Sequence, residues 1–310
     1  MSKETRVITI FVSFLMLATF SAAIFAQGKS GVFPTGGADN PMLQGGGPAI
    51  GATATPTPIP LLVAPYDFNH DLKPDFVLLN ASTRQMAVWY MNNKVRIGGA
   101  YTPTLPAGWN VIDVRDFNGD GNNDYALFNS STRQTAIWYL SGVTRIGSAY
   151  GPTLPSGWAL VATADFNNDG KPDYILYNAG TRQTAVWYMN NNIFAGSVLA
   201  PPLPAGWSIA GIADFNRDGK ADYLLFNAST RQSAIWYLSG VTRIGAVYGP
   251  TIASGYQLMG AADFNGDGKP DYVLFNPSTR GTALWYLNNN IFIGSAYGPP
   301  LPAGWILLLP

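Results

Sequence analysis

The sequence repeats itself every 49 residues over most of its length. The tripeptide Asp-Phe-Asn begins at 67, 116, 165, 214 and 263, and Trp-Tyr pairs begin at 89, 138, 187, 236 and 285. A fixed period of this size is typical of repeat architectures, in which each unit buries its apolar face against its neighbours. The chain from residue 61 onward is therefore predicted to be an array of five similar units.

One unit is predicted to contain four strands. In the third unit, residues 159–164, 174–177, 184–189 and 193–199 are apolar runs, separated by an acidic loop, a polar turn and an Asn-Asn-Asn turn. Apolar residues fall on both alternating faces, so the strands are expected to be covered on both sides. Such units favour an all-β propeller with five four-stranded blades. A solenoid is the alternative, although 49 residues is long for one rung.

The closure of the ring is left open by the sequence. Residues 305–310 repeat the beginning of a unit with no further unit behind them. Units 2 and 4 share Leu-Ser-Gly-Val-Thr-Arg-Ile-Gly, whereas units 1, 3 and 5 carry an Asn-Asn turn, which suggests amplification by pairs. The extra strand is then a remnant. The alternatives are that it packs on the outside or joins another chain.

The first 60 residues differ from the repeats. Lys3 and Arg6 precede an apolar run, so residues 1–26 are predicted to be a signal peptide, with an uncleaved membrane anchor as the alternative. Residues 27–60 are rich in Gly, Pro and Thr and are predicted to be a flexible spacer. We expect a secreted, extracellular or cell-surface protein that has no membrane contact once the signal is cleaved. The chain contains no Cys, so packing or bound metal must replace disulfides.

Each unit carries the loop Asp-Phe-Asn-x-Asp-x-x-x-Asp, with Gly at the sixth position in four of the five units. Oxygen side chains at positions 1, 3, 5 and 9, with the backbone carbonyl of position 7, make a set of hard ligands that suits Ca²⁺. Up to five calcium ions are predicted. The candidate ligands are Asp67, Asn69, Asp71, Lys73, Asp75; Asp116, Asn118, Asp120, Asn122, Asp124; Asp165, Asn167, Asp169, Lys171, Asp173; Asp214, Asn216, Asp218, Lys220, Asp222; and Asp263, Asn265, Asp267, Lys269, Asp271.

The competing interpretation is that these loops are ordinary Asp- and Asn-rich turns. A turn needs one or two such residues, whereas each loop has three carboxylates within nine residues, which repel one another without a cation. Only one His and no Cys are present, which excludes a soft-metal site. The first loop has Leu72 where the others have Gly, so its site is expected to bind most weakly.

The acidic loops resemble those of the FG-GAP or VCBS-type repeat family, including the calcium loops of integrin α-chain propellers. The resemblance covers residues 61–310 and is carried by segments such as Asp-Phe-Asn-Gly-Asp-Gly-Lys-Pro-Asp at 263–271 and Thr-Ala-Leu-Trp at 282–285. It implies a propeller with calcium loops between the first and second strands of each blade. Members of this family serve in adhesion, in carbohydrate binding or beside secreted enzymes, and many have seven blades.

An enzyme is not expected. Fifteen of the 18 acidic residues are loop aspartates, and Asp113 is the one other carboxylate within the repeats. General acid–base catalysis and glycoside hydrolysis need free carboxylates, and a Ser nucleophile would have no base. His70 occupies a variable loop position. With no net formal charge, the chain also gives no indication of nucleic-acid binding.

Two functions remain open: extracellular adhesion or carbohydrate binding, with glycans or surface proteins as partners, and a calcium-rigidified structural or assembly module. The repeated arginines at 84, 133, 182, 231 and 280 either present charge to an acidic or sugar ligand, or they cap turn carbonyls or stack on the nearby Trp. The tryptophans at 89, 138, 187, 236 and 285 either line glycan pockets or fill the blade interfaces. Five bound calcium ions would make the mature protein strongly cationic and attract acidic polysaccharides.

Overall fold

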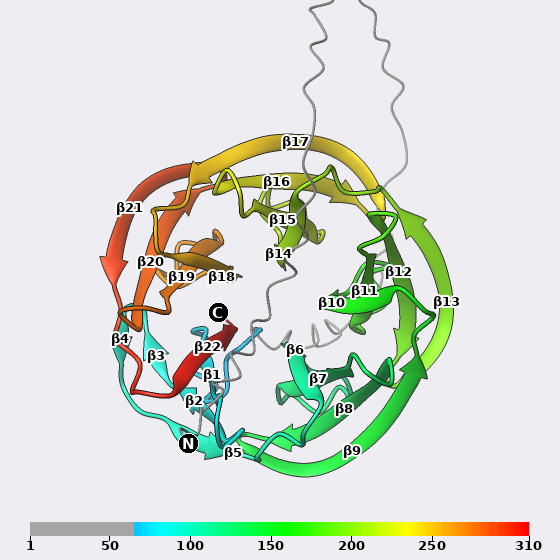
Figure 1. Cartoon of the computed structure of the whole chain (residues 1–310), viewed down its shortest axis with the longest axis horizontal. Coiled ribbons are helices and arrows are strands. Elements are labelled where there is room, and N and C mark those ends of the chain that lie inside the picture. Colours follow the sequence, from blue (N-terminus) through cyan, green and yellow to red (C-terminus); the bar gives the residue numbers. More distant parts are fainter. Residues whose placement is uncertain (1–64, 310) are drawn as a thin grey trace, which may run out of the picture. The chain divides into compact units, whose positions relative to one another are not determined.

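The computed structural model describes residues 65–309, and these residues form five four-stranded antiparallel sheets arranged in a ring (Figure 1). The predicted five-bladed, all-β propeller is confirmed. The predicted signal peptide and spacer lie outside the described residues. Within residues 65–309 there is no helix of the length and hydrophobicity that a membrane crossing requires.

The blades follow one another in chain order, and each is a meander from the ring centre outward. Blade 1 contains β1 (Phe76–Asn80), β2 (Met86–Trp89) and β5 (Ala100–Thr102), with the hairpin β3 (Met91–Asn92) and β4 (Val95–Arg96). Blade 2 contains β6 (Trp109–Arg115), β7 (Asp124–Asn129), β8 (Gln134–Ser141) and β9 (Thr144–Thr153). Blade 3 contains β10 (Trp158–Ala164), β11 (Asp173–Asn178), β12 (Gln183–Asn190) and β13 (Ile193–Ala200). Blade 4 contains β14 (Trp207–Ala213), β15 (Asp222–Asn227), β16 (Gln232–Ser239) and β17 (Thr242–Thr251). Blade 5 contains β18 (Gln257–Ala262), β19 (Asp271–Asn276), β20 (Gly281–Asn288) and β21 (Ile291–Tyr297).

The last strand of the chain completes the first blade. β22 (Trp305–Leu309) pairs antiparallel with β1, with Leu307 opposite Leu78 and Trp305 opposite Asn80. It takes the innermost position of blade 1 (Figure 1). The expectations that this segment is a remnant, packs outside or joins another chain are wrong. Without β22, the inner edge of β1 would expose unpaired backbone groups and apolar side chains, so the two ends of the propeller must meet.

The core lies between neighbouring blades and uses the Phe of the repeated tripeptide. In four blades this Phe packs edge-on against the Tyr that follows the acidic loop of the next blade, as Phe166 does against Tyr223 with ring centroids 6.0 Å apart. The partner tyrosines at 125, 174, 223 and 272 have no exposed surface. Edge-to-face packing adds about 0.5–1.5 kcal/mol per pair beyond burial. The tripeptide therefore serves both the loop and the contact between blades.

The repeated tryptophans are packed against other side chains of their blades. Trp89, Trp138 and Trp236 are buried, and the corresponding tryptophans of blades 3 and 5 are half-buried. In blades 1, 2 and 4 the guanidinium of Arg96, Arg145 or Arg243 lies over the indole. In blades 3 and 5, Phe194 and Phe292 of the outer strands pack edge-on against it.

The arginine of each polar turn has a positive φ of about 60°, and its carbonyl accepts an N–H from the segment that leads to the next blade. In four of the five units its guanidinium also donates to a carbonyl of that segment, as Arg133 Nε does to Leu154 O. The capping interpretation of the arginines is thus confirmed.

The ring is not fully symmetric. Asp113 on β6 accepts hydrogen bonds from the Tyr66 hydroxyl at 2.7 Å and from the Thr163 N–H of β10 at 2.7 Å, and it lies 3.9 Å from Arg115. The alternating Asn turns form a second asymmetric set, in which a Tyr hydroxyl donates to an Asn of the next blade at 2.6 Å. These pairs are Tyr139–Asn191, Tyr237–Asn289 and Tyr286–Asn93.

Candidate metal-binding loops

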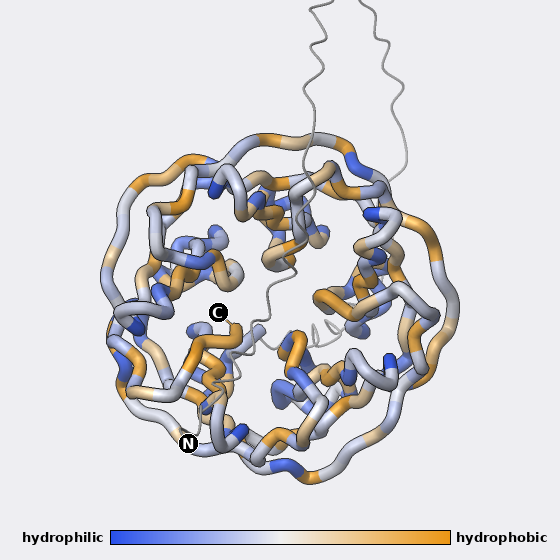
Figure 2. The backbone as a smooth tube through the Cα atoms, viewed as in Figure 1, coloured by the Kyte–Doolittle hydropathy of each residue, from blue (hydrophilic) through white to orange (hydrophobic). Residues whose placement is uncertain are grey.

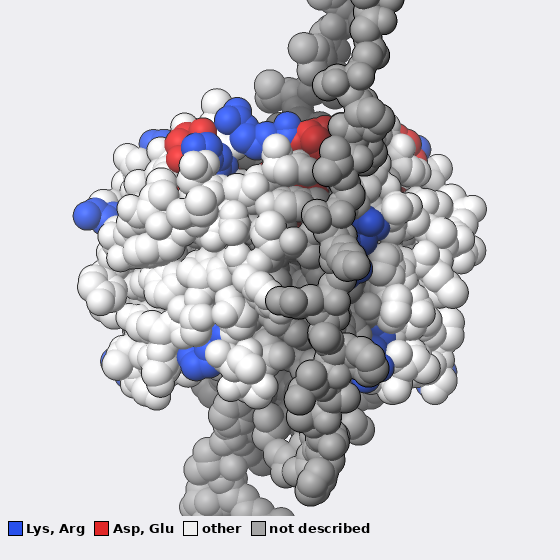
Figure 3. Space-filling model, turned by 90° about the horizontal axis from the view of Figure 1, so that it is seen from above, with Lys and Arg blue, Asp and Glu red and all other residues white. Residues whose placement is uncertain are grey.

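All five acidic loops lie on one face of the ring. In blades 2 to 5 the loop joins the first strand to the second, and in blade 1 it leads into β1, which holds the second position. The strands of every blade alternate in direction. The loops must therefore emerge at the same end of each blade. Figure 3 shows the acidic side chains gathered along that face, with lysines and arginines among them.

The Asp at position 1 holds the loop backbone in a closed curve. In every loop its carboxylate accepts the N–H of position 5 at 3.1 to 3.2 Å and the N–H of position 6 at 2.7 to 2.9 Å. The same pattern in five loops means that the five backbones share one conformation. Charged acceptors make hydrogen bonds to N–H groups that are about twice as strong as neutral ones.

Positions 3 and 5 complete the curve. The Asn oxygen accepts the N–H of position 5 at 2.8 to 3.1 Å, and the Asp at position 5 accepts the N–H of position 7 at 2.8 to 3.0 Å. In most loops this Asp also accepts the amide N–H of the Asn side chain, as Asp169 does from Asn167. A carboxylate oxygen that accepts one N–H retains a second lone pair for another donor or a cation, although in loop 2 Asp116 and Asp120 each have one oxygen that already accepts two hydrogen bonds.

Position 9 differs because its Asp is fully buried in all five loops. One oxygen accepts the N–H of the Phe at position 2, and the other accepts an N–H of the third strand at 2.9 to 3.1 Å. This Asp therefore ties the loop to its own blade. Burial raises the pKa of Asp75 to about 7, against the lowering effect of its two N–H donors, and the charges of Asp71 and Asp67 raise the pKa further.

The backbone turns at positions 4 and 6 are left-handed. Position 6 has φ between 78° and 86° where it is Gly, and Leu72 adopts 64° at the same place in the first loop. A side chain there costs about 1–2 kcal/mol of strain, which Gly avoids. Leu72 has 76% of its surface exposed to solvent.

The donor set of the loops fits a hard cation better than any other group. Each loop carries three carboxylates and an amide oxygen within nine residues, and within residues 65–309 the one ion pair is Arg115–Asp113, outside the loops. In the same residues no three acidic or histidine side chains converge as a ready-made metal cluster. The Asp at position 9, also a predicted ligand, accepts a backbone N–H with each of its two oxygens. An ion would be held with it by the side chains of positions 1, 3 and 5, the carbonyl of position 7 and water, and the ion would supply the missing positive charge.

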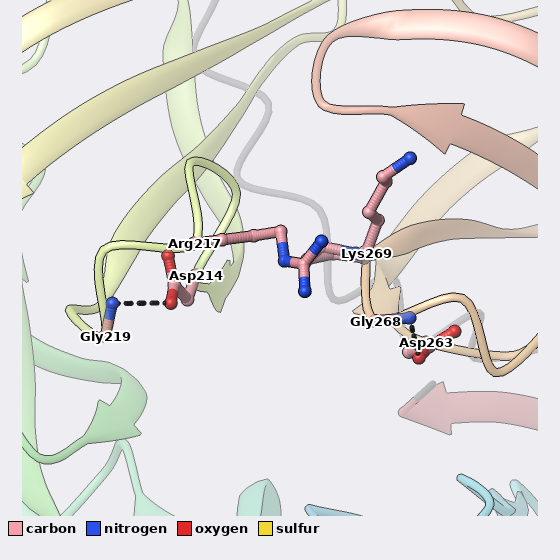
Figure 4. Close-up of a pocket in the computed structure, with 7 residues that line it drawn as sticks. Asp214, Arg217, Gly219, Asp263, Gly268 and Lys269 are labelled. Atoms are coloured by element: carbon pink, nitrogen blue, oxygen red, sulfur yellow. Dashed lines mark hydrogen bonds between the residues drawn. The ribbon is translucent and has the colours of Figure 1, made fainter.

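A feature that the repeat pattern does not reveal lies between loops 4 and 5. Arg217 occupies the variable fourth position of its loop and extends toward Gly268 of the next loop, beside Lys269 (Figure 4). Neither cationic side chain has a hydrogen bond or ion-pair partner in the described part of the chain. The pocket of about 440 Å³ between them is also lined by Asp214 and Asp263, whose carboxylates face their own loop backbones. No other loop has Arg at this position.

Solved structures with a similar architecture are distant from this chain. A protein of unknown function from Bacteroides caccae is 12% identical with a TM-score of 0.40, covering 72% of this chain and 73% of that one. A luciferin-regenerating enzyme is 8% identical with a TM-score of 0.43, covering 77% and 78%. The Malassezia sympodialis allergen Mala s 1 is 10% identical with a TM-score of 0.37, covering 72% and 75%. No protein of curated function matches the sequence.

A family model gives the more specific result. The model of the FG-GAP-like repeat matches at 67–127, 116–176 and 165–225, with successive matches displaced by one 49-residue unit. Together the matches span about half of the chain, and each begins at the first Asp of an acidic loop. The chain therefore belongs to the FG-GAP-like repeat family.

Proposed function

We propose that this protein is an extracellular, calcium-rigidified propeller that binds glycans or surface proteins and catalyses no reaction. The observation that carries the proposal is the set of five acidic loops on one face, each with the same backbone conformation and three carboxylates without a cationic partner. Their arrangement favours a cation in each loop, because like charges held this close repel one another in the metal-free state.

Calcium supports binding in two ways. It fixes the loops that form one face of the ring, and it adds positive charge to that face. Arg217 and Lys269 already place two unpaired cations there. An anionic group of a surface polysaccharide or protein is thus the ligand chemistry that this face favours, and repeated loops allow several contacts at once.

The remaining acidic group supports a non-catalytic role. Asp113 is buried, with 3% of its surface exposed, and accepts four hydrogen bonds from neighbouring groups. A general acid or base must reach a substrate proton, and Asp113 is enclosed between inner strands. His70 lies in an exposed loop without a hydrogen-bond partner in residues 65–309.

The calcium part of the proposal is tested on purified full-length protein. Metal analysis after dialysis against a calcium buffer is expected to find up to five Ca²⁺ per chain, and chelation with EDTA should lower the melting temperature. A ligand at 100 times its Kd adds about 2.7 kcal/mol per site, so several sites give a large shift. Asp169→Asn should remove one ion, and Asp39→Asn is the control with the same charge change outside the repeats. Unchanged metal content and melting under EDTA would refute calcium binding.

The ligand part is tested on a glycan array with and without EDTA. Retention of acidic polysaccharides that requires calcium supports the proposal, and Arg217→Ala should weaken it. Retention that does not respond to EDTA counts against a role of calcium in ligand binding. Absence of binding to any glycan or cell surface favours the second candidate below.

A structural or assembly role is the second candidate, and the outermost strands favour it. β9, β13, β17 and β21 are each hydrogen-bonded to one neighbour only and carry exposed apolar residues around the ring (Figure 2). Apart from Leu72, Val95 and Ile97, every large exposed hydrophobic residue within 65–309 lies on β5, β9, β13, β17 or β21: Tyr101, Ile146, Tyr150, Ile193, Phe194, Leu199, Ile244, Tyr248, Ile291, Phe292, Ile293 and Tyr297. Exposed edge strands of this kind are templates for association. Sedimentation velocity of the calcium-loaded protein distinguishes a monomer from an assembly.

A further inference from the structure

Blade 3 contains a groove between two tryptophans of its inner and third strands. It has a volume of about 330 Å³ and is lined by Trp158 of β10, Trp187 and Ala185 of β12, Ser197, Val198 and Leu199 of β13, and Pro155. Both indoles are half-buried, while Pro155, Ser197 and Leu199 are exposed. The groove is therefore partly open to solvent and has two indole rings in its lining.

A single substitution within the repeat explains why the groove is in blade 3. In blades 1, 2 and 4 a Tyr of the outer strand lies against the Trp that begins the inner strand, with ring centroids 6.1 Å apart in Tyr101–Trp305, Trp109–Tyr150 and Trp207–Tyr248. Blade 3 has Leu199 at this position, and its shorter side chain makes no ring contact with Trp158. Blade 5 keeps the Tyr, as Tyr297, and replaces the Trp by Tyr256.

We propose that this groove binds a pyranose ring of a neutral carbohydrate. None of the lining residues is charged, so the groove gives no anchor for an anion or a cation. A purely apolar ligand would favour an enclosed cavity, since an open groove leaves much of its surface in water. A sugar ring has an apolar C–H face that can lie on an indole, and its hydroxyl groups can remain in solvent or bond to the side-chain hydroxyl of Ser197. That hydroxyl has no hydrogen-bond partner within residues 65–309.

The groove and the acidic loops occupy different parts of blade 3. Trp158 begins β10, and the acidic loop follows the far end of that strand at Ala164. Leu199 lies near the end of β13, on the side of the polar turns. The inference deepens the proposed function by naming a glycan class and a site, and it does not need a calcium ion at the groove.

The experiment uses full-length protein and a panel of neutral oligosaccharides with glucose, mannose, galactose or N-acetylglucosamine units, followed by calorimetry and tryptophan fluorescence. The wild type is expected to bind at least one with one site per chain. Leu199→Tyr restores the residue of the other blades, fills the groove and should weaken binding at least tenfold. Unchanged melting and calcium content of this variant would show that the fold is retained.

The converse variant is the matched control. Tyr150→Leu removes the ring that closes the equivalent position of blade 2, beside Trp109 and Trp138, and is expected to raise the number of sites toward two. Failure of every neutral sugar to bind the wild type, or equal binding by Leu199→Tyr, would overturn the groove assignment. Calcium-dependent binding of acidic polysaccharides would still stand in that case, so the two proposals fail separately.

Discussion

The closure of the ring gives the sharpest prediction. Leu307 lies in the middle of β22, has 1% of its surface exposed, and packs in one apolar cluster with Phe76, Leu78 and Phe264 of blades 1 and 5. We predict that Leu307→Ala lowers the free energy of unfolding by about 2–5 kcal/mol, the range for truncating a buried Leu. The loss of stability for Leu307→Ala should lie in the upper part of this range. The backbone of β22 is fixed by pairing with β1, so it cannot easily move in to fill the cavity.

The assay is urea unfolding of the calcium-loaded protein followed by tryptophan fluorescence. With an m-value of about 2–3 kcal/mol per M for a domain of this size, the midpoint should fall by about 1 M or more. Ile244→Ala removes a similar apolar group from an exposed position of β17 and should change stability by no more than about 0.5 kcal/mol. Equal effects of the two substitutions, or a chain lacking residues 305–310 that unfolds like the wild type, would refute closure by β22.

Three further predictions concern contacts that the repeat does not share. Asp113→Asn places an amide donor against the N–H and hydroxyl donors that now surround the carboxylate, and should lower stability by about 2–4 kcal/mol in thermal or urea unfolding; stability equal to wild type would contradict it. Tyr139→Phe removes the hydrogen bond to the Asn turn of blade 3 and should cost about 0.5–1.5 kcal/mol. Tyr188→Phe should be neutral, because the Tyr188 hydroxyl has no hydrogen-bond partner within residues 65–309; urea unfolding of both variants checks this. Gly219→Ala should destabilise loop 4 by about 1–2 kcal/mol and weaken its calcium affinity, whereas Leu72→Gly should strengthen calcium binding in loop 1, as read by calorimetry.

The sequence alone was sufficient to predict the repeat units and the shape of their acidic loops. A 49-residue period with apolar runs on both strand faces leads to stacked four-stranded sheets, because no single unit can cover its own apolar surface. The oxygen-bearing positions of the loop and the left-handed Gly are local features, and local hydrogen bonds within nine residues hold them in place. The capping role of Arg133 and its counterparts was likewise among the interpretations that the repeated Arg allowed.

Contacts between distant parts of the chain were decided only by the tertiary structure. Residues 305–310 repeat the beginning of a unit, but the repeat does not say which strands they join, and those strands lie more than 200 residues earlier. The unpaired edge of β1 makes that position favourable. The burial of Asp75 and its counterparts depends on an N–H from the third strand. The groove of blade 3 depends on Leu199 lying where other blades place a Tyr against a Trp on another strand. The period therefore determines what each unit is, and the packing of units around the ring determines which of their small differences become sites.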